Sequence, residues 1–354
     1  MSVGAEPRPG LRDIEVYDSP QVDVPVRLNT NECPHPLPES FLGELATTIR
    51  DLPLHRYPDG HMRRLLAELA AASMHPVEGV WAANGSNEVL TELLQAYGGP
   101  GRRAAVFEPT YLLHSRLARL THTEVERMAL PRSFVLGEAE VTSVIDMAPD
   151  IVFVCSPNNP TGNAQPLSAI VAIANGLPNA LVIVDEAYGE FAPAASAQAL
   201  IATNPNIAIT RTFSKGFALA GARLGYLLGA PDVIADLERV RLPYHLSALT
   251  QTAGIVALRH REEASALLGA IRVQRDRISR ELRTLPHVTV YPSDANFVLF
   301  VPPVDAGLVW QGLLDRGVLV RDLSAVVHNA LRVTAGTEHE VDRFLTAIKE
   351  VLAA

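Results

Sequence analysis

Four apolar segments of strand length constrain the fold of this chain more than any other feature. Nearly continuous apolar runs are typical of parallel β-strands that helices cover on both faces, whereas a strand with one face in water alternates apolar and polar residues. Helix-length stretches separate the runs, so the sequence predicts an α/β fold built on a parallel sheet. The four segments are residues 104–107, 151–155, 181–184 and 207–209.

Polar, chemically capable residues follow each apolar segment at once. Because ligands of open α/β sheets bind where the carboxyl ends of the strands meet, we expect these residues to share one site. The four motifs are Glu108-Pro109-Thr110-Tyr111, residues 156–162 (SPNNPTG), Asp185-Glu186-Ala187-Tyr188 and Thr212-Phe213-Ser214-Lys215.

Lys215 carries the most specific chemistry among these motifs. Its neighbours are small or apolar residues rather than charged ones. Desolvation in such surroundings lowers the pKa of an amine and makes it nucleophilic, which suits a lysine that forms a Schiff base with an aldehyde. A Ser-Lys pair by itself is equally compatible with a solvated lysine at a strand end, so the assignment depends on the other motifs.

A glycine-serine turn offers a place for a phosphate group. Residues 80–83 are predicted to form a short strand, and residues 89–97 are apolar at helical spacing, with Gly85-Ser86-Asn87 between them. A helix that opens on such a turn presents free backbone N–H groups and the positive end of its dipole to an anion. An ordinary helix N-cap at Ser86 or Asn87 explains the same residues.

Composition narrows the possible functions. The 354 residues carry a formal net charge of −9 without a basic stripe, which argues against a nucleic-acid partner. Two cysteines, Cys33 and Cys155, lie outside any CxxC or Cys/His pattern, so we expect neither a disulfide framework nor a metal site. No secretory signal or membrane-length apolar run is visible, and we expect a cytoplasmic protein without a membrane partner.

The chain divides into three parts by its residue pattern. Residues 1–40 are rich in proline and predict an extended N-terminal arm, and residues 41–242 predict a large α/β domain. Residues 243–354 predict a smaller α+β domain. Its expected elements are one long helical stretch at 249–285, strands at 288–290, 296–300, 318–321 and 330–334, and helices at 307–316 and 338–353.

Taken together, the motifs resemble those of fold-type-I pyridoxal-phosphate aminotransferases, and their detail resembles the histidinol-phosphate aminotransferase subfamily. The resemblance implies a large domain on a mostly parallel seven-stranded sheet, a smaller α+β C-terminal domain, an N-terminal arm and a homodimer with shared active sites. The matching segments, which run in the family's order, are residues 28–32, 56–59, 84–88, 108–111, 184–191, 211–226, 242–246, 293–299 and 331–336.

The resemblance also implies a cofactor, pyridoxal 5′-phosphate, and residues that hold it. Lys215 would bind the cofactor as a Schiff base and move a proton between substrate and cofactor, and Asp185 would pair with the pyridinium nitrogen. Asn159 and Tyr188 would bind the phenolic oxygen. The other implied contacts are the backbone N–H groups of Ser86 and Asn87, the side chains of Thr212, Ser214 and Arg223, the stacked ring of Tyr111, and Tyr57 from the neighbouring subunit.

The implied substrates are small molecules that alternate in one site by a ping-pong mechanism. They are L-histidinol phosphate or imidazole-acetol phosphate, and glutamate or 2-oxoglutarate, as in histidine biosynthesis. Arg332 would bind the glutamate carboxylate and the substrate phosphate in turn, with Arg321 assisting, because a guanidinium binds such anions through two parallel hydrogen bonds. A surface cation on a strand explains Arg321 nearly as well.

Asn31, His35 and Tyr57 complete the implied substrate site. After Asn31-Glu32 the subfamily usually continues with asparagine, proline and tyrosine, whereas this chain has Cys33-Pro34-His35. If the tyrosine binds the substrate phosphate, His35 is expected to replace its hydrogen-bond donor. The departure bears on the substrate rather than on the chemistry.

Three other functions stay open on the sequence. An aromatic amino-acid aminotransferase of the same fold would use Arg332 for the α-carboxylate of both substrates. A pyridoxal-phosphate decarboxylase or lyase would show no amino transfer to a keto acid. A cofactor-binding regulatory module without catalysis is disfavoured, because no DNA-reading segment is appended to the chain.

Overall fold

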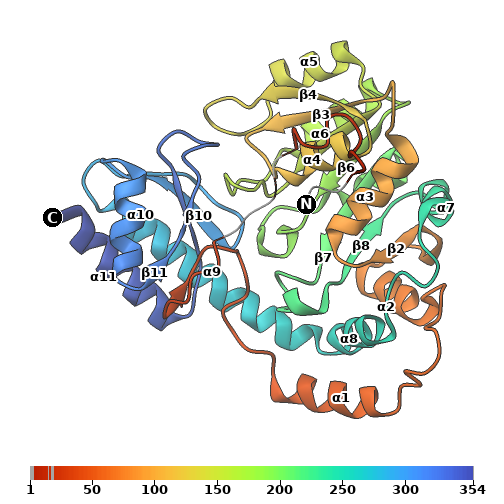
Figure 1. Ribbon diagram of the computed structural model, residues 1–354, viewed down its shortest axis with the longest axis horizontal. Helices are drawn as coiled ribbons and strands as arrows, with labels where there is room; N and C mark the ends of the chain where they lie inside the picture. Colours follow the sequence, from red (N-terminus) through yellow and green to blue (C-terminus); the bar gives the residue numbers. More distant parts are fainter. Residues whose placement is uncertain (1–3, 15, 17–19, 354) are drawn as a thin grey trace.

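A seven-stranded sheet dominates the computed structural model, which describes residues 4–14, 16 and 20–353 (Figure 1). In sheet order its strands are β2 (Val80–Ala83), β8 (Gly225–Leu228), β7 (Ile207–Thr212), β6 (Leu181–Asp185), β5 (Ile151–Cys155), β3 (Arg103–Glu108) and β4 (Glu124–Ala129). All pairings from β7 to β4 are parallel, and β8 runs antiparallel to both β7 and β2. The predicted mostly parallel seven-stranded sheet is confirmed.

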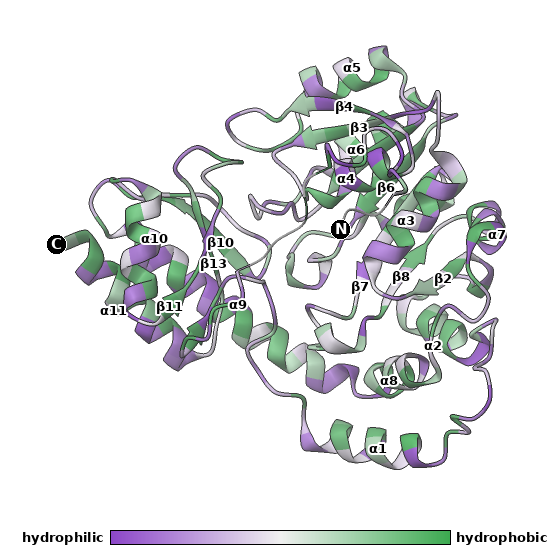
Figure 2. Cartoon of the chain, in the orientation of Figure 1, coloured by the Kyte–Doolittle hydropathy of each residue, from purple (hydrophilic) through white to green (hydrophobic). Residues whose placement is uncertain are grey.

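Helices surround this sheet and bury its central strands (Figure 1). Every residue of β5 and β6 is buried, and Figure 2 shows hydrophobic residues concentrated on the central strands. No helix in the described ranges is both long and apolar enough to cross a membrane. The α-helices of this part are α1 (Glu39–Arg50), α2 (Arg63–Ser73), α3 (Ser86–Tyr97), α4 (Leu113–Leu120), α5 (Glu138–Met147), α6 (Leu167–Gly176), α7 (Pro231–Val240) and α8 (Ala248–Arg259), and its 3₁₀-helices are η1 (Val77–Gly79), η2 (Gly189–Phe191), η3 (Ala197–Ala202) and η4 (Ala220–Ala222).

The remainder of the chain forms a second, smaller layer of sheet and helices. An antiparallel four-stranded sheet has the order β12 (Arg321–Asp322), β13 (Leu331–Thr334), β10 (Phe297–Val301) and β9 (Thr289–Val290). The helices α9 (Arg261–Arg283), α10 (Ala306–Asp315) and α11 (Glu338–Ala353) accompany it. Near the other end of the chain, β1 (Val26–Arg27) pairs in parallel with β11 (Val318–Leu319).

Two hydrophobic clusters show how the chain is distributed between these layers. Leu258 of α8 belongs to the cluster around the large sheet, and Ile271 of α9 belongs to the cluster around the small sheet. Val26 and Leu28 are buried in the second cluster, so this end of the predicted arm packs with the C-terminal elements. The division of the chain at residues 40 and 243 stays a prediction.

The single long helical stretch predicted for residues 249–285 is wrong, because two helices meet at His260. Its ring is hydrogen-bonded to Glu263 through Nδ1 and to Glu44 of α1 through Nε2, both at 2.9 Å. These two carboxylates raise the pKa of His260. Apolar periodicity continues through the junction, but the two helices pack in different clusters, and periodicity alone does not reveal such a change of partner.

The expected strand at residues 318–321 is also divided. β11 pairs with β1, whereas β12 belongs to the four-stranded sheet, and Val320 lies between them. The sequence analysis missed β4 because this strand lies at the edge of its sheet, where most of its residues keep contact with water. Its side chains therefore lack the continuous apolar pattern of β5 and β6.

Gly225 allows β8 to approach the turn that precedes α3. A Cβ at this position would lie 2.1 Å from the backbone nitrogen of Ser86 and 2.3 Å from the carbonyl carbon of Gly85. Both obstacles are backbone atoms, which cannot move aside as a flexible side chain can. The absence of a side chain at residue 225 therefore fixes the distance between the sheet and the start of α3.

We expect the Gly225→Ala variant to lower the free energy of unfolding by about 2 kcal/mol or more, as overpacking of a buried site does. Gly221→Ala is a matched control a few residues away, because a Cβ there meets nothing within 4 Å. It should change stability by less than about 0.5 kcal/mol. Thermal unfolding of both variants measures the difference, and equal melting temperatures would contradict the close approach.

Candidate active site

A cavity of about 250 Å³ lies where the carboxyl ends of β5, β6 and β7 meet residues of the small sheet. It brings together residues that are far apart in the sequence, and every predicted site residue except Tyr57 and His35 lines it. Those that line it are Asn31, Ser86, Asn87, Tyr111, Asn159, Asp185, Tyr188, Thr212, Ser214, Lys215, Arg223, Arg321 and Arg332.

Lys215 extends into this cavity from the loop after β7. Its Nζ donates a hydrogen bond to the carbonyl oxygen of Thr30 at 3.1 Å and lies 5.8 Å from the centre of the Tyr188 ring. Burial lowers the pKa of Lys215 to about 8, and the charges of Arg332 and Arg223 act in the same direction. About a tenth of this amine is therefore neutral and nucleophilic at pH 7, far more than for an ordinary lysine.

Asp185 ends β6 and is 1% exposed. Its Oδ1 accepts a hydrogen bond from the backbone N–H of Ala187 at 3.1 Å, and its Oδ2 lies 2.9 Å from Nε2 of His114. Because a carboxylate only accepts hydrogen bonds, Nε2 is the donor of this pair. The arrangement holds a carboxylate at the inner end of the cavity.

The sequence analysis missed His114, which fixes the position of Asp185. His114 lies on α4, is fully buried, and stacks on Phe153 of β5 with ring centres 4.7 Å apart. A lone histidine on an apolar helix face carries no catalytic signature. Its place three residues after Tyr111, in the helix that follows a site motif, was the one available signal.

Hydroxyls, a cation and a helix N-terminus surround the region predicted to bind phosphate. Gly85 precedes α3 with φ of 84° and has no side chain to cap the helix. Nη1 of Arg223 donates to Oγ of Ser214 at 3.2 Å, and Oγ1 of Thr212 lies 3.0 Å from the same atom. A Cβ at Gly85 would lie only 2.6 Å from Nη2 of Arg223, so a side chain there would displace the guanidinium. Such a combination favours an anion.

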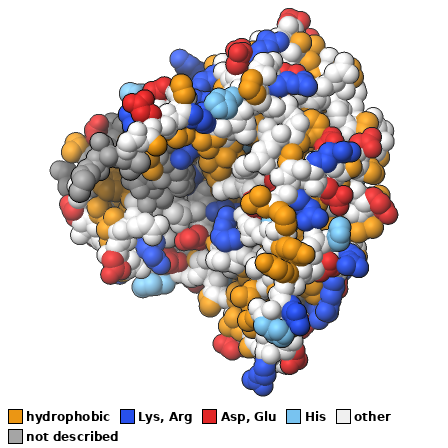
Figure 3. Space-filling model, turned by 45° about the vertical axis from the view of Figure 1, so that its right-hand side comes forward, with side chains coloured by type: hydrophobic (Ala, Val, Ile, Leu, Met, Phe, Trp, Pro, Cys, Tyr) orange, Lys and Arg blue, Asp and Glu red, His pale blue; other side chains and the backbone are white. Residues whose placement is uncertain are grey.

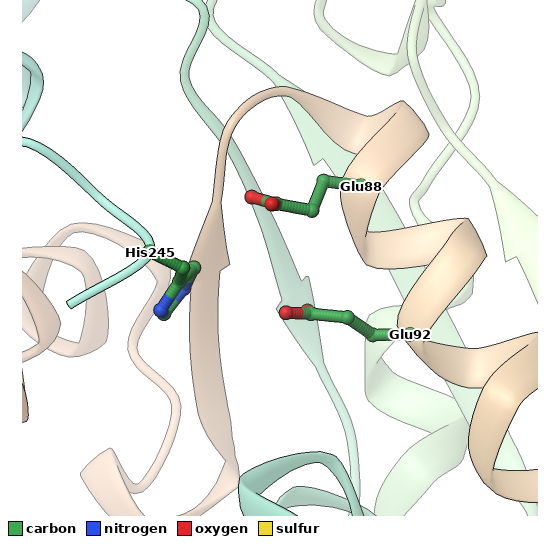
Figure 4. A group of neighbouring side chains, drawn as sticks. All are labelled: Glu88, Glu92 and His245. Atoms are coloured by element: carbon green, nitrogen blue, oxygen red, sulfur yellow. The ribbon is translucent and has the colours of Figure 1, made fainter. Parts of the chain in front are cut away.

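Behind this turn, Glu88 and Glu92 extend from α3 towards His245 (Figure 4). One ligand atom from each lies within 4.8 Å of the others, but both carboxylates are engaged by protein donors. Oε2 of Glu88 accepts from the backbone and side chain of Asn84, at 2.5 and 2.8 Å, and Oε2 of Glu92 accepts from Nε1 of Trp81 at 2.7 Å. Burial raises the pKa of Glu92 to about 7. Glu88 therefore holds the turn before α3 through Asn84, and Glu92 holds Trp81 of β2.

Asn31 and Arg332 bring the N-terminal segment and the small sheet to the cavity. Nδ2 of Asn31 donates to the Tyr188 hydroxyl at 2.9 Å. Nη1 of Arg332 donates to Oδ1 of Asn159 at 2.5 Å, and Nη2 donates to the carbonyl oxygen of Asn29 at 2.9 Å. These contacts orient the two side chains predicted to bind the phenolic oxygen, Asn159 and Tyr188, from the opposite wall.

Tyr57 and His35 lie outside the cavity of their own chain. Tyr57 is 80% exposed and stacks on Tyr244 with ring centres 4.5 Å apart. His35 is half-buried, and its backbone oxygen lies 3.7 Å from Sγ of Cys33. The resemblance placed His35 near the substrate because it stands where the subfamily has a tyrosine. Alignment with a motif does not fix where a side chain points, and His35 lies between two prolines, Pro34 and Pro36.

Comparison with known proteins decides the family. The model of the aminotransferase class I and II family matches residues 24–348. The chain belongs to this family. Histidinol-phosphate aminotransferase of Mycolicibacterium smegmatis is 46% identical over 354 residues, which cover 97% of this chain and 93% of that protein. The enzyme of the same name from Frankia casuarinae is 46% identical over 360 residues and covers 98% and 90%.

Solved structures of this family share the fold. A crystal structure of histidinol-phosphate aminotransferase from Sinorhizobium meliloti, in complex with pyridoxal-5′-phosphate, superposes with a TM-score of 0.88 at 23% identity and covers 99% of both chains. L-threonine-O-3-phosphate decarboxylase from Porphyromonas gingivalis reaches 0.82 at 20% identity and covers 93% of this chain and 100% of that one. The predicted fold class and family resemblance are confirmed.

We expect capture of pyridoxal phosphate by the cofactor-free protein to accelerate with pH through about 8, the pKa of Lys215, because the neutral amine is the nucleophile. The chain has one other lysine, Lys349, whose Nζ lies 3.2 Å from Oε2 of Glu281 on the protein surface. Reduction with borohydride followed by peptide mass spectrometry locates the attachment. Lys349→Arg should leave the profile unchanged, and labelling confined to Lys349 would contradict the assignment.

Proposed function

We propose that this chain is a pyridoxal-phosphate-dependent histidinol-phosphate:2-oxoglutarate aminotransferase of histidine biosynthesis. The observation that carries the proposal is the meeting, in one cavity, of Lys215 with a lowered pKa, the buried Asp185 and an anion-binding helix N-terminus. Relatives at 46% identity that bear this name support the substrate. We place the enzyme in the cytoplasm, where its free thiols Cys33 and Cys155 stay reduced.

The residues of the cavity fit pyridoxal phosphate. Arg223, Ser214, Thr212 and the start of α3 would hold the phosphate, Asp185 would pair with the ring nitrogen, and Tyr111 would stack on the ring. Tyr111 is held on this side by Asn87, whose Oδ1 accepts from its hydroxyl at 3.3 Å. When bound, the cofactor supplies an electron sink for negative charge on the substrate carbon that bears the amino group.

Lys215 moves the proton in this scheme. Its amine would accept a proton from the carbon that bears the substrate amino group and would deliver it to the bound cofactor, as amino transfer requires. A base with a pKa of about 8 suits this task, because it is present in both protonation states near neutral pH. Asp185, held by His114, supports the reaction by keeping a negative charge at the inner end of the cavity.

Two arginines lie where they could bind the anionic groups of the substrates. Arg332 is buried, and Arg321 lies beside it in register on the neighbouring strand β12. Guanidinium groups bind both carboxylates and phosphates through paired hydrogen bonds. The same pair would therefore bind the carboxylate of glutamate in one half-reaction and the phosphate of histidinol phosphate in the other.

A homodimer with shared active sites explains the position of Tyr57. Tyr57 stacks on the exposed Tyr244, and Leu54 and Leu242, which are also exposed, lie within three residues of these two tyrosines in the chain. Figure 3 brings the side of α2 and α8 forward and shows hydrophobic side chains in groups between charged ones. Grouped apolar surface of this kind is typical of protein interfaces. We infer that Tyr57 contacts the cofactor of the partner subunit.

The direct test compares amino donors. Purified protein with 2-oxoglutarate should turn over L-histidinol phosphate much faster than L-phenylalanine, and Lys215→Ala should remain folded but lose at least about 10³-fold in rate. A preference for phenylalanine would indicate an aromatic amino-acid aminotransferase instead. Loss of carbon dioxide without amino transfer would indicate a decarboxylase.

Shared active sites predict complementation between two inactive variants. When Lys215→Ala and Tyr57→Ala chains are co-expressed, half of the dimers are mixed, and each mixed dimer contains one intact site. Activity should therefore return to roughly a quarter of the wild-type value. Separately expressed and unmixed variants are the control. No recovery in a mixture shown to contain mixed dimers would contradict the inferred position of Tyr57.

A further inference from the structure

Three branched aliphatic side chains line the cavity without a part in the chemistry above. They are Leu112, Leu323 and Val326, which we call the aliphatic rim. Leu112 is 51% exposed and Val326 is 49% exposed, so both keep large apolar surfaces in contact with water at the edge of the cavity. Covering such surfaces with an apolar part of a ligand is favourable in proportion to the area that is buried.

The rim is contributed by both layers of the molecule. Leu112 immediately precedes α4 and follows Tyr111, which lines the same cavity. Leu323 and Val326 lie in the connection between β12 and β13, next to Arg321. The rim therefore lies near both the residues that would hold the cofactor ring and the arginines that would bind the substrate anion.

Hydrogen bonds hold the β12–β13 connection in a defined shape. The backbone N–H of Leu323 donates to Ala330 at 3.0 Å, and that of Val326 donates to Leu323 at 2.8 Å. Both the backbone N–H and the hydroxyl of Ser324 donate to Oδ1 of Asp322, at 2.8 and 2.7 Å. The backbone that carries the two aliphatic side chains is thus ordered before any ligand arrives, which reduces the entropy lost on binding.

Charge is distributed unevenly over the cavity wall. Lys215, Arg223, Arg321 and Arg332 supply its cationic part, whereas the rim is uncharged. An anionic substrate that also carries a flat ring, whose faces can pack on aliphatic side chains, matches both surfaces at once. Glutamate has two carboxylates and no ring, so it matches only the cationic part.

We propose that Leu112, Leu323 and Val326 bind the ring of the amino donor and determine specificity for ring-bearing substrates. The proposal rests on the proposed function, in which one cavity accepts histidinol phosphate and glutamate in alternate half-reactions. It assigns the discrimination between the two to apolar contact at the rim, since both substrates bring an anion to the arginines.

The test measures the two half-reactions separately in the Leu112→Ala/Val326→Ala double variant of the holoenzyme. The KM for L-histidinol phosphate should rise by about tenfold, as expected when apolar contacts in a binding site are removed. Single-turnover constants for L-glutamate should change by less than about twofold. Val326→Thr, which keeps the shape but replaces a methyl group by a hydroxyl, should also raise the KM.

Two control variants distinguish the loss of contacts at the aliphatic rim from a loss of folding or of activity in general. Leu308→Ala removes an exposed aliphatic side chain on α10 that does not line the cavity, and should leave both half-reactions unchanged. Leu112→Met keeps the apolar volume at this position, so its KM for histidinol phosphate should stay close to the wild-type value. Melting temperatures equal to that of the wild type confirm that all variants fold.

Equal losses in both half-reactions, or no change in either, would overturn the role of the rim. Failure of the proposed function has a different signature, because the wild-type protein would then not turn over histidinol phosphate. The same variants are in that case assayed with L-phenylalanine, which also carries a ring. A raised KM for phenylalanine supports the rim, and an unchanged KM overturns it.

Discussion

The parallel register of β5, β6 and β7 is the constraint on which the site depends. Asp185 is paired with Cys155 on one side and with Thr210 on the other, so β5 and β6 end level and β7 continues two residues further, to Thr212. Side chains from segments 30 residues apart therefore reach one cavity without any long excursion of the chain. Buried strands of this kind tolerate little displacement, because a shift of one residue would reverse every side chain.

The second determinant is the contact between the two layers. Lys215 from the large sheet donates to Thr30, and Arg332 from the small sheet donates to Asn159, so each layer supplies hydrogen-bond partners to the other. Four cations line the same cavity, and Asp185 is the carboxylate among the residues that line it in the described chain. The cavity therefore carries an excess of positive charge that bound anions would neutralise, which agrees with a phosphorylated cofactor and anionic substrates.

Much of the fold and site was predictable from local patterns. Continuous apolar runs predicted the parallel strands, and the small neighbours of Lys215 predicted an amine of lowered pKa, which the structure gives as about 8. The same reasoning failed at His260, where periodicity continues through a change of packing partner. It also missed His114, because a buried histidine is recognised as a support only when the carboxylate beside it is known.

The sequence by itself determined which chemical groups are present and which strands carry them, because residue identity and the spacing of apolar residues are local properties. Only the tertiary structure decided which groups meet. It placed Arg332 against Asn159, Asn31 against Tyr188 and Glu88 behind the turn before α3, and it left Tyr57 and His35 outside the cavity. The reason is physical: distances between residues far apart in the chain follow from the packing of whole helices and sheets, which no single segment encodes.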